Sequence, residues 1–344
     1  MRRSISSSRA VARLFFTVLA QLILALPFLV FVGSLAAQTI PLRYAQAYSA
    51  MRSIFSLPVS VADRQGFFRR EGLNFHVVVP IPGGSDKMSD SLHDDTADVT
   101  HIATAFLIRA VLNGSDAVAI AGEFNNPIYS LVARPEIKNI ADLKGKLIGL
   151  ADEAGTITIS TRKLLALHGL REGDFRVKII EGTPARFTCL RRGDCDAVPL
   201  GQPQDFLALN EGYRLLGLST EVVPEFLYTV TAVRRSWAEA HKDAIVRYVR
   251  ALGGAFKFIR DPAKRDVVVK TIVDTTGSTE AIAKQTLALF FDPERGVLPK
   301  QAEINVKGLD QVIAFMGEAG NLKPPLPPAE RFVDLQYLQA AGIK

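Results

Sequence analysis

The chain has 344 residues, 22% of them charged, and a formal net charge of +6 at pH 7. Four of its positive charges are arginines within the first 13 residues, and the rest of the chain carries only +2. This balance, without any run rich in Lys and Arg, argues against a nucleic-acid-binding protein. The part beyond the N-terminal segment, about 305 residues, is long for one hydrophobic core and favours two lobes.

The N-terminal segment has the three parts of an export signal. The arginines precede an apolar run at 14–32, and small residues such as Ser34 and Ala36 follow it. We therefore expect cleavage after Ala36 or Ala37, so that residues 1–37 form a signal peptide and the protein is exported to the periplasm. Because the apolar run nearly reaches membrane-spanning length, an anchor retained on the outer face of the inner membrane is the alternative.

Strands and helices alternate through the first half of the exported part. The expected strands are 42–47, 74–80, 97–101, 117–122 and 128–133, and the expected helices are 58–72, 83–93 and 103–112. Gly72 suits the left-handed residue that follows the last turn of a helix. The alternation predicts a mostly parallel sheet with helices on both faces.

A second unit of the same kind begins near Arg134. Its expected elements are a short helix and strand within 140–150, a helix at 155–167, a strand at 177–180, a helix at 184–191 and a strand at 196–200. A strand at 226–233 is expected to return the chain to the first lobe. Helices are then expected at 242–259, 263–273, 278–290 and 301–318, with prolines between 324 and 328 ending the last of them.

Three strings within these elements resemble one protein family. They are GFFRREGL at 66–73, where a helix joins a strand, IADLKGKLIGL at 140–150, and the shorter RGDCDA at 192–197. Together with the export signal, they resemble the solute-binding proteins of ABC importers. The branch that they resemble includes binders of aliphatic sulfonates, taurine, nitrate and thiamine-pyrimidine precursors.

The resemblance implies an α/β fold of the type 2-like periplasmic-binding-protein kind. Each of two lobes would be a mostly parallel sheet flanked by helices, with the ligand cleft between the lobes. Residues 38–130 would form the first part of lobe 1, 131–230 lobe 2, and 231–344 the return to lobe 1 with the C-terminal helices. Crossings near 128–134 and 226–233 would join the lobes. The protein would be a monomer without a cofactor that delivers its ligand to the permease of an ABC importer.

Two expected helix starts carry residues suited to an anion. In α/β proteins, ligands bind beyond the carboxyl ends of the strands, where free N–H groups and the positive end of the helix dipole attract anions. Gly84 and Ser85 form such a start in lobe 1, and Gly155 and Thr156, with Thr158, form one in lobe 2. We expect them to face each other across the cleft. Ordinary helix caps are the alternative.

Further candidate ligand contacts follow from the expected strand ends. They are Ser49 and Met51 after the first strand, Thr100, His101 and Thr104 at the end of the third, Gln202 after the last strand of lobe 2, and Tyr228 in the returning crossover. A structural role for the histidine and a solvated loop around Ser49 are the alternatives. A sulfonate, carboxylate or nitrate would suit the helix starts, and neutral pyrimidine-like or aromatic ligands stay open.

The remaining motifs argue against catalysis. The two cysteines, Cys189 and Cys195, can form a disulfide in an oxidising compartment or remain buried thiols, and their spacing indicates no metal site. The sequence contains no His-Glu-x-x-His, nucleophile-elbow, phosphate-loop or dinucleotide motif. A thiamine-pyrimidine synthase-like enzyme is one alternative, although the cysteines do not match its cysteine-rich motif. A ligand-sensing domain tethered to the membrane is the other.

Overall fold

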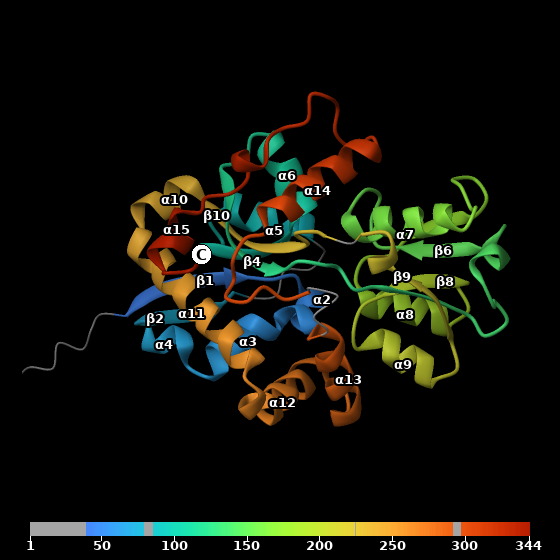
Figure 1. Ribbon diagram of the computed structural model, residues 1–344, viewed down its shortest axis with the longest axis horizontal. Coiled ribbons are helices and arrows are strands. Elements are labelled where there is room, and N and C mark those ends of the chain that lie inside the picture. Colours follow the sequence, from blue (N-terminus) through green and yellow to red (C-terminus); the bar gives the residue numbers. More distant parts are fainter. Residues whose placement is uncertain (1–38, 79–84, 224, 292–296) are drawn as a thin grey trace, which may run out of the picture. The chain divides into compact units, whose positions relative to one another are not determined.

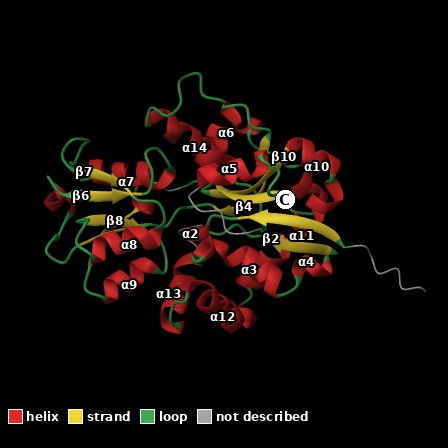
Figure 2. Ribbon diagram, turned by 180° about the vertical axis from the view of Figure 1, so that it is seen from behind, coloured by secondary structure: helices red, strands yellow, loops and turns green. Residues whose placement is uncertain are grey.

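The computed structural model describes residues 39–78, 85–223, 225–291 and 297–344. Two five-stranded sheets form the framework of these residues (Figures 1 and 2). The first has the order β2 (Leu73–Val77), β1 (Ile40–Ala45), β3 (Val99–Ala103), β10 (Thr229–Arg234), β4 (Ala117–Phe124). The second has the order β7 (Arg176–Ile179), β6 (Leu147–Leu150), β8 (Ala197–Leu200), β5 (Ser130–Ala133), β9 (Arg214–Leu218).

Each sheet contains one strand that runs against the others. β10 is antiparallel to both β3 and β4, and β5 is antiparallel to both β8 and β9. The pairs that β1 forms with β2 and β3, and β6 with β7 and β8, are parallel. The expected fold class, two mostly parallel sheets flanked by helices, is therefore confirmed.

Helices cover both faces of the first sheet (Figure 1). On one side lie α3 (Leu57–Arg64), α4 (Phe67–Arg70), α11 (Lys242–Arg260), α12 (Arg265–Thr276) and α13 (Glu280–Phe290). On the other lie α5 (Ser85–His93), α6 (Thr104–Leu112) and α14 (Val306–Glu318). Three shorter helices, α2 (Tyr48–Met51), α10 (Arg235–Ala240) and α15 (Gln336–Ala340), complete this part.

The second sheet is sandwiched between α7 (Thr156–Leu167) on one face and α8 (Thr183–Arg191) with α9 (Gln204–Asn210) on the other (Figures 1 and 2). Side chains of β5 alternate between two separate cores. Leu131 packs with Leu164 and Leu165 of α7, whereas Val132 packs with Phe187 and Leu190 of α8. This alternation follows from the two-residue period of a strand, which directs neighbouring side chains to opposite faces.

The helix expected at 58–72 is divided into two, which corrects the sequence prediction. α3 ends at Arg64, and α4 begins at Phe67 after Gly66, whose φ is +70°. A residue with this left-handed backbone cannot continue a helix, and glycine adopts it without the steric cost that a Cβ would bring. Gly72, with φ +72°, has the left-handed conformation that the sequence predicted.

The helix expected at 301–318 begins later, at Val306. The side chain of Asn305 accepts a hydrogen bond of 2.9 Å from the backbone N–H of Gly308, and so caps the first turn of α14. The residues before Asn305 are therefore outside the helix. An Asn at this position is a typical cap that the apolar spacing alone did not reveal.

Two segments connect the sheets, and Ser219 joins them to each other. The chain leaves the first sheet after β4 and enters the second at β5, so the outward crossing is 125–129. It returns between the short 3₁₀ helix at Ser219–Glu221 and the start of β10. Ser219 donates its N–H to the carbonyl of Tyr129 (2.9 Å) and accepts the N–H of Tyr129 on its hydroxyl (2.9 Å). The segments expected as crossings near 128–134 and 226–233 thus correspond mainly to β5 and β10, which are strands of the sheets. The connections between the sheets lie just before these two strands.

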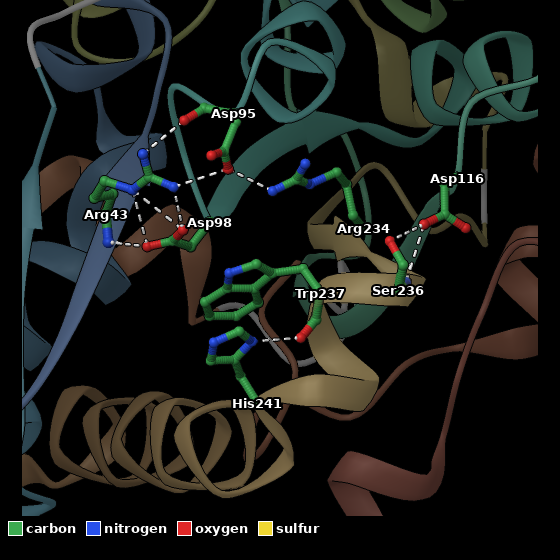
Figure 3. Close-up of polar contacts among 8 residues, drawn as sticks. All are labelled: Arg43, Asp95, Asp98, Asp116, Arg234, Ser236, Trp237 and His241. Carbon is green, nitrogen blue, oxygen red and sulfur yellow. Dashed lines mark hydrogen bonds and ion pairs between the residues drawn. The ribbon is translucent and has the colours of Figure 1, made fainter.

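A charge network holds the first sheet together at the edge where β3 begins (Figure 3). Asp98 accepts the backbone N–H of Arg43 (2.8 Å) and its guanidinium (2.6 Å), which ties β1 to β3. Asp95 lies between the guanidinium groups of Arg43 and Arg234, at the end of β10. Hydrogen bonding to Asp98 raises the pKa of Arg43, and hydrogen bonding from Arg43 lowers the pKa of Asp95. The network therefore joins three neighbouring strands through charged contacts.

We expect Asp98→Ala to lower the free energy of unfolding by about 2 kcal/mol, because it removes the buried acceptor that Arg43 uses. The side chain of Arg43 is 38% exposed, so water replaces part of the lost contact and keeps the loss below that of a fully buried pair. Urea denaturation followed by circular dichroism measures the change. The control is Glu280→Ala, which removes an exposed ion pair with Lys284 and should leave stability unchanged. Equal stability of the two variants would contradict the role of the network.

Candidate functional site

A cavity of about 520 Å³ lies where the carboxyl ends of strands from the two sheets meet. On the side of the first sheet it is lined from the end of β3, the starts of α5 and α6, and the segment after β1. On the side of the second sheet it is lined by the loop after β6, the start of α7, the end of β7 and the start of α8. This is the position at which α/β sheets bind ligands, and the volume is typical of a site for a small organic molecule.

Arg186 from α8 lines this cavity with a side chain that is 1% exposed. Its guanidinium donates to the carbonyl oxygens of Pro199 (2.8 Å) and Ile180 (3.1 Å) and to the hydroxyl of Thr183 (3.1 Å). All three acceptors are neutral, and among the described residues no carboxylate lies within ion-pair distance of Arg186. Burial lowers the pKa of Arg186, because desolvation disfavours the charged form. An anion in the cavity would stabilise this charge.

Two tyrosines stand beside Arg186, one on each connection between the sheets. The hydroxyl oxygens of Tyr129 and Tyr228 lie 3.2 Å apart, and either can donate to the other. Burial raises the pKa of both tyrosines, so both hydroxyls keep their hydrogen at neutral pH. Their mutual bond uses one of the two hydrogens. Tyr129 is also hydrogen-bonded to Thr183, which accepts from Arg186, so a ligand oxygen would join this group of hydrogen bonds.

His101 lines the opposite side of the cavity and is oriented by a buried carboxylate. Its Nδ1 lies 2.6 Å from Oε2 of Glu123, which is completely buried on β4. The other oxygen of Glu123 accepts the hydroxyl of Thr231 (2.6 Å), on the strand β10 that runs between β3 and β4. Because Nδ1 is engaged, Nε2 is the ring nitrogen that remains for a ligand.

Gly155 is bonded within its own loop, contrary to the expectation that its N–H faces a ligand. Asp152 accepts the N–H of Gly155 on its carboxylate, and the hydroxyl of Thr158 donates to the backbone carbonyl of Asp152 (2.8 Å). A Cβ at Gly155 would overlap the carboxylate of Asp152. The glycine therefore lets the loop fold closely onto itself. Thr156, the first residue of α7, does line the cavity.

Among the other residues proposed from the sequence, Ser85, His101 and Tyr228 line the cavity. Ser85 opens α5 and accepts the N–H of Ala103 on its hydroxyl (3.2 Å), so its own hydrogen is available to another acceptor. Gly84 lies outside the described residues. The pair of helix starts expected to face each other is thus represented in the cavity by Ser85 and Thr156.

Five further candidates, Met51, Thr100, Thr104, Thr158 and Gln202, are not among the described residues that line the cavity. Thr100 donates its hydroxyl to the carbonyl of Ala45 (3.0 Å), and Gln202 donates to the buried carboxylate of Asp205 (2.8 Å). Thr104 is buried at the start of α6, and Met51 is half-buried in α2. Ser49 belongs to α2, and its side chain lies outside the described part of the chain. A strand end does not by itself decide which side chain turns toward the ligand.

Two sets of contacts connect the two sides directly, one between residues that line the cavity and one outside its lining. Arg109 of α6 donates to the carbonyl of Ala154 (3.0 Å), in the loop that precedes α7. Lys163 of α7 forms an ion pair with Glu318, and its ammonium lies 3.9 Å from the ring centre of Phe315 in α14. These contacts hold α7 against the helices of the first sheet.

The helix that carries Arg186 is tied to its sheet by a disulfide. The Sγ atoms of Cys189 and Cys195 are bonded, with the Cα atoms 5.4 Å apart. The bond joins the last turn of α8 to the residues that lead into β8, the strand that contains the Pro199 carbonyl to which Arg186 donates. It therefore limits the movement of α8 relative to that strand.

Metal ligands and membrane helices can be assessed for the described residues alone. Within them, no group of three or more His, Cys, Asp or Glu side chains is arranged to hold a metal ion. No helix in the same ranges combines the length and apolar character needed to cross a membrane. The signal peptide or anchor expected at 1–37 lies outside these ranges.

Sequence reasoning missed Arg186, Tyr129, Asp152 and Arg109 as cavity residues. For Arg186 a signal was present: Gly182 and Thr183 form a third helix start with glycine and a hydroxyl after a strand, like the two starts that were considered. Arg186 follows on the next turn. The other three have no local pattern that distinguishes them.

The two sheets, the two connections and the cavity at the strand ends define the periplasmic-binding-protein fold. Residues 55–264 match the family described as NMT1/THI5 like, and the chain belongs to this family. The chain is 23% identical over 314 residues to YtlA of Bacillus subtilis strain 168, whose name proposes that it is a binding protein. That alignment covers 87% of this chain and 90% of YtlA.

Solved structures share the fold at low sequence identity. A ligand-binding component of an ABC-type import system from Staphylococcus aureus has a TM-score of 0.71 at 13% identity, covering 88% of this chain and 99% of its own. The periplasmic aliphatic sulphonate binding protein SsuA of Escherichia coli has a TM-score of 0.66 at 16% identity, with coverages of 88% and 99%. The desulfurization enzyme DszB has a TM-score of 0.63 at 15% identity, with coverages of 88% and 98%. Identities this low establish the shared fold alone.

Proposed function

We propose that this protein is an exported solute-binding protein, which captures a small anionic molecule and delivers it to the permease of an ABC importer. The observation that carries the anionic part is Arg186, a buried guanidinium in the cavity that only neutral groups contact. Thr229 adds support. It lines the cavity at 2% exposure, and its hydroxyl has no hydrogen-bond partner among the described residues. Buried polar groups are normally satisfied, and a ligand oxygen would satisfy this one.

The cavity also contains carboxylates, and their positions decide how strongly they oppose an anion. Glu153 and Glu181 are exposed, so water screens their charge, whereas Asp152 is half-buried, accepts the N–H of Gly155 and acts electrostatically on Arg186. Two charges 4 Å apart interact by about 1 kcal/mol in water but by about 4 kcal/mol near a protein surface of lower effective dielectric constant. The buried Arg186 therefore has more influence on a bound ligand than the exposed glutamates have.

Binding by closure accounts for the contacts that join the two sides. A ligand that touches both sides stabilises the arrangement in which Arg109 reaches Ala154 and Lys163 reaches Glu318. A permease can distinguish this closed form from an open one. The structural similarity to a component of an import system and to a periplasmic sulphonate-binding protein supports this role, as does the export signal that the sequence predicts at 1–37. In this proposal the protein acts as a periplasmic monomer.

An enzyme is the second candidate, because DszB shares the fold and a synthase-like alternative remained from the sequence. His101 lines the cavity, and together with the buried Glu123 it forms a pair that could transfer a proton. No described cysteine is free to act as a nucleophile, since Cys189 and Cys195 are bonded to each other. We therefore favour binding without conversion of the ligand. A membrane-tethered sensing domain would share the same binding step.

The test uses protein purified from the native envelope. Mass spectrometry of its N-terminus is expected to find a chain that begins near Ala37, and an intact Met1 would contradict cleavage. Thermal-shift screening against sulfonates, carboxylates, nitrate and neutral pyrimidines is expected to show stabilisation by an anion. After long incubation, the bound compound should be recovered unchanged by mass spectrometry. Steady formation of a product would assign the protein to the enzymes, and stabilisation by neutral pyrimidines alone would contradict an anionic ligand.

A further inference from the structure

Among the described residues, the aromatic side chains of Phe55, Phe106, Tyr129 and Tyr228 line the cavity, and all but Phe106 form one packed surface. The ring of Phe55 lies 6.0 Å from that of Tyr129 at 19° between planes, and 5.5 Å from that of Tyr228 at 64°. All three side chains are buried. The fourth ring, Phe106, has the guanidinium of Arg109 over one face at 4.3 Å. A further ring can pack on such a surface in an offset or edge-on arrangement. These ring contacts add to the binding free energy that burial of apolar area provides.

The groups suited to an anion meet the same aromatic surface. The hydroxyls of Tyr129 and Tyr228 lie 3.2 Å apart, and the charge of Arg186 acts on both phenols. Each of these hydroxyls is attached to a ring of the aromatic surface, so the hydrogen-bond donors lie directly at the edge of that surface. A ligand that uses both must carry its anionic group directly on its apolar body.

The size and the charges of the cavity further limit the class of ligand that it can hold. A volume of about 520 Å³ accommodates an organic molecule and is larger than an inorganic anion requires. Asp152, Glu153 and Glu181 line the side of the second sheet. A second negative charge on the ligand would meet these carboxylates, so one negative charge is favoured over two.

We infer that the ligand is an aromatic monoanion, with a carboxylate or sulfonate attached directly to a planar ring. The ring packs against Phe55 and the two tyrosines, and the anionic group accepts hydrogen bonds from one tyrosine hydroxyl and the guanidinium of Arg186. This inference rests on the proposed function, because it specifies which anion the cavity holds.

Isothermal titration with matched compounds tests the inference. Benzoate and benzenesulfonate are the probes, and cyclohexanecarboxylate has the same charge and a similar size without a π system. We expect benzoate to bind about fivefold to tenfold more tightly than cyclohexanecarboxylate, as edge or stacking contacts between rings would give. Benzamide, the neutral analogue, is expected to bind at least about 50-fold more weakly than benzoate, and terephthalate, with two charges, about tenfold more weakly.

Variants separate the ring from the charge. Phe55→Leu keeps an apolar side chain and should reduce the preference for benzoate over cyclohexanecarboxylate to below about twofold. Tyr228→Phe keeps the ring and removes a donor, so it should weaken both compounds alike and leave their ratio unchanged. Phe67→Leu is the control, because Phe67 packs against Phe258 outside the cavity. Circular dichroism tests whether each variant is folded. If a variant does not fold, the comparison of the compounds on the native protein still tests the inference.

The outcomes distinguish this inference from the proposed function. If cyclohexanecarboxylate binds as tightly as benzoate, or if only methanesulfonate or nitrate binds, the aromatic ligand is wrong and the anion-binding role stands. An unchanged ratio in folded Phe55→Leu also overturns the inference. If benzamide binds as tightly as benzoate, or if no anion binds, the anionic ligand itself is wrong and both proposals fall.

Discussion

Replacing Arg186 by Gln is expected to weaken binding of the tightest anion in the panel by about 100-fold, because removing one partner of a buried charged contact commonly costs about 2–5 kcal/mol. The guanidinium is 1% exposed and is held by Pro199, Ile180 and Thr183, so its geometry is set before a ligand arrives. Gln can keep one of these hydrogen bonds but carries no charge. Isothermal titration at fixed ionic strength measures the loss.

Two further variants make the experiment specific. Arg186→Lys keeps the charge without the planar fork, so we expect its affinity to lie between that of the native protein and that of the Arg186→Gln variant. Arg191→Gln is the control on the same helix, because Arg191 is exposed and pairs with Glu211 away from the cavity. It should bind the anion as the native protein does. A folded Arg186→Gln variant with native affinity would place the anion elsewhere, and the Lys variant provides the comparison if the Gln variant does not fold.

Gly308→Ala is expected to lower the free energy of unfolding by about 3 kcal/mol, although Ala in a helix usually stabilises by about 1 kcal/mol relative to Gly. A Cβ at Gly308 would lie 2.5 Å from the carbonyl oxygen of Phe226 and 2.8 Å from the side chain of Asn305. The first contact is with backbone, which cannot move aside as a flexible side chain can. The second disturbs the cap of α14. The midpoint of urea unfolding, followed by circular dichroism, measures the loss.

Gly317→Ala is the matched control, since it makes the same change near the other end of α14. A Cβ there would meet only side-chain atoms of Leu326, the nearest at 3.0 Å, and these can shift. We expect stability to be unchanged or to rise by up to about 1 kcal/mol. The same substitution at these two glycines of α14 is thus expected to change the free energy of unfolding in opposite directions. A Gly308→Ala variant as stable as Gly317→Ala would show that Phe226 does not pack against α14 in this way.

The secondary structure was largely predictable because its signals are local. Apolar runs and glycines predicted most strands and helices of both sheets, although not α9 or β9, and the strings at 66–73 and 140–150 indicated the family. The errors also have local causes. Gly66 falls inside the helix expected at 58–72, whereas its left-handed backbone separates α3 from α4, and the apolar spacing does not indicate the cap formed by Asn305. A pattern of apolar spacing does not record where a glycine leaves the helical conformation.

The candidate site was only partly predictable. Ser85, His101, Thr156 and Tyr228 line the cavity as the strand-end rule suggested, while Thr100 turns inward to the carbonyl of Ala45. Residues that line the cavity and residues that do not both lie at strand or helix ends, so the sequence does not distinguish between them. The alternation of side chains along β3 and the position of the neighbouring strand β1 decide which of them reaches the cavity.

The sequence by itself determined the class of fold, the family and the expectation of export, because these depend on composition, periodicity and short strings. Only the tertiary structure decided the chemistry of the cavity. Arg186, Tyr129 and Tyr228 are far apart in the chain, and they meet because β5, β8 and β10 place them at one end of the two sheets. The same folding bonds the N–H of Gly155 to Asp152 and leaves Arg186 with neutral partners. Hydrogen-bond partners and burial depend on such distant neighbours, and so the charge available to a ligand is a property of the folded chain.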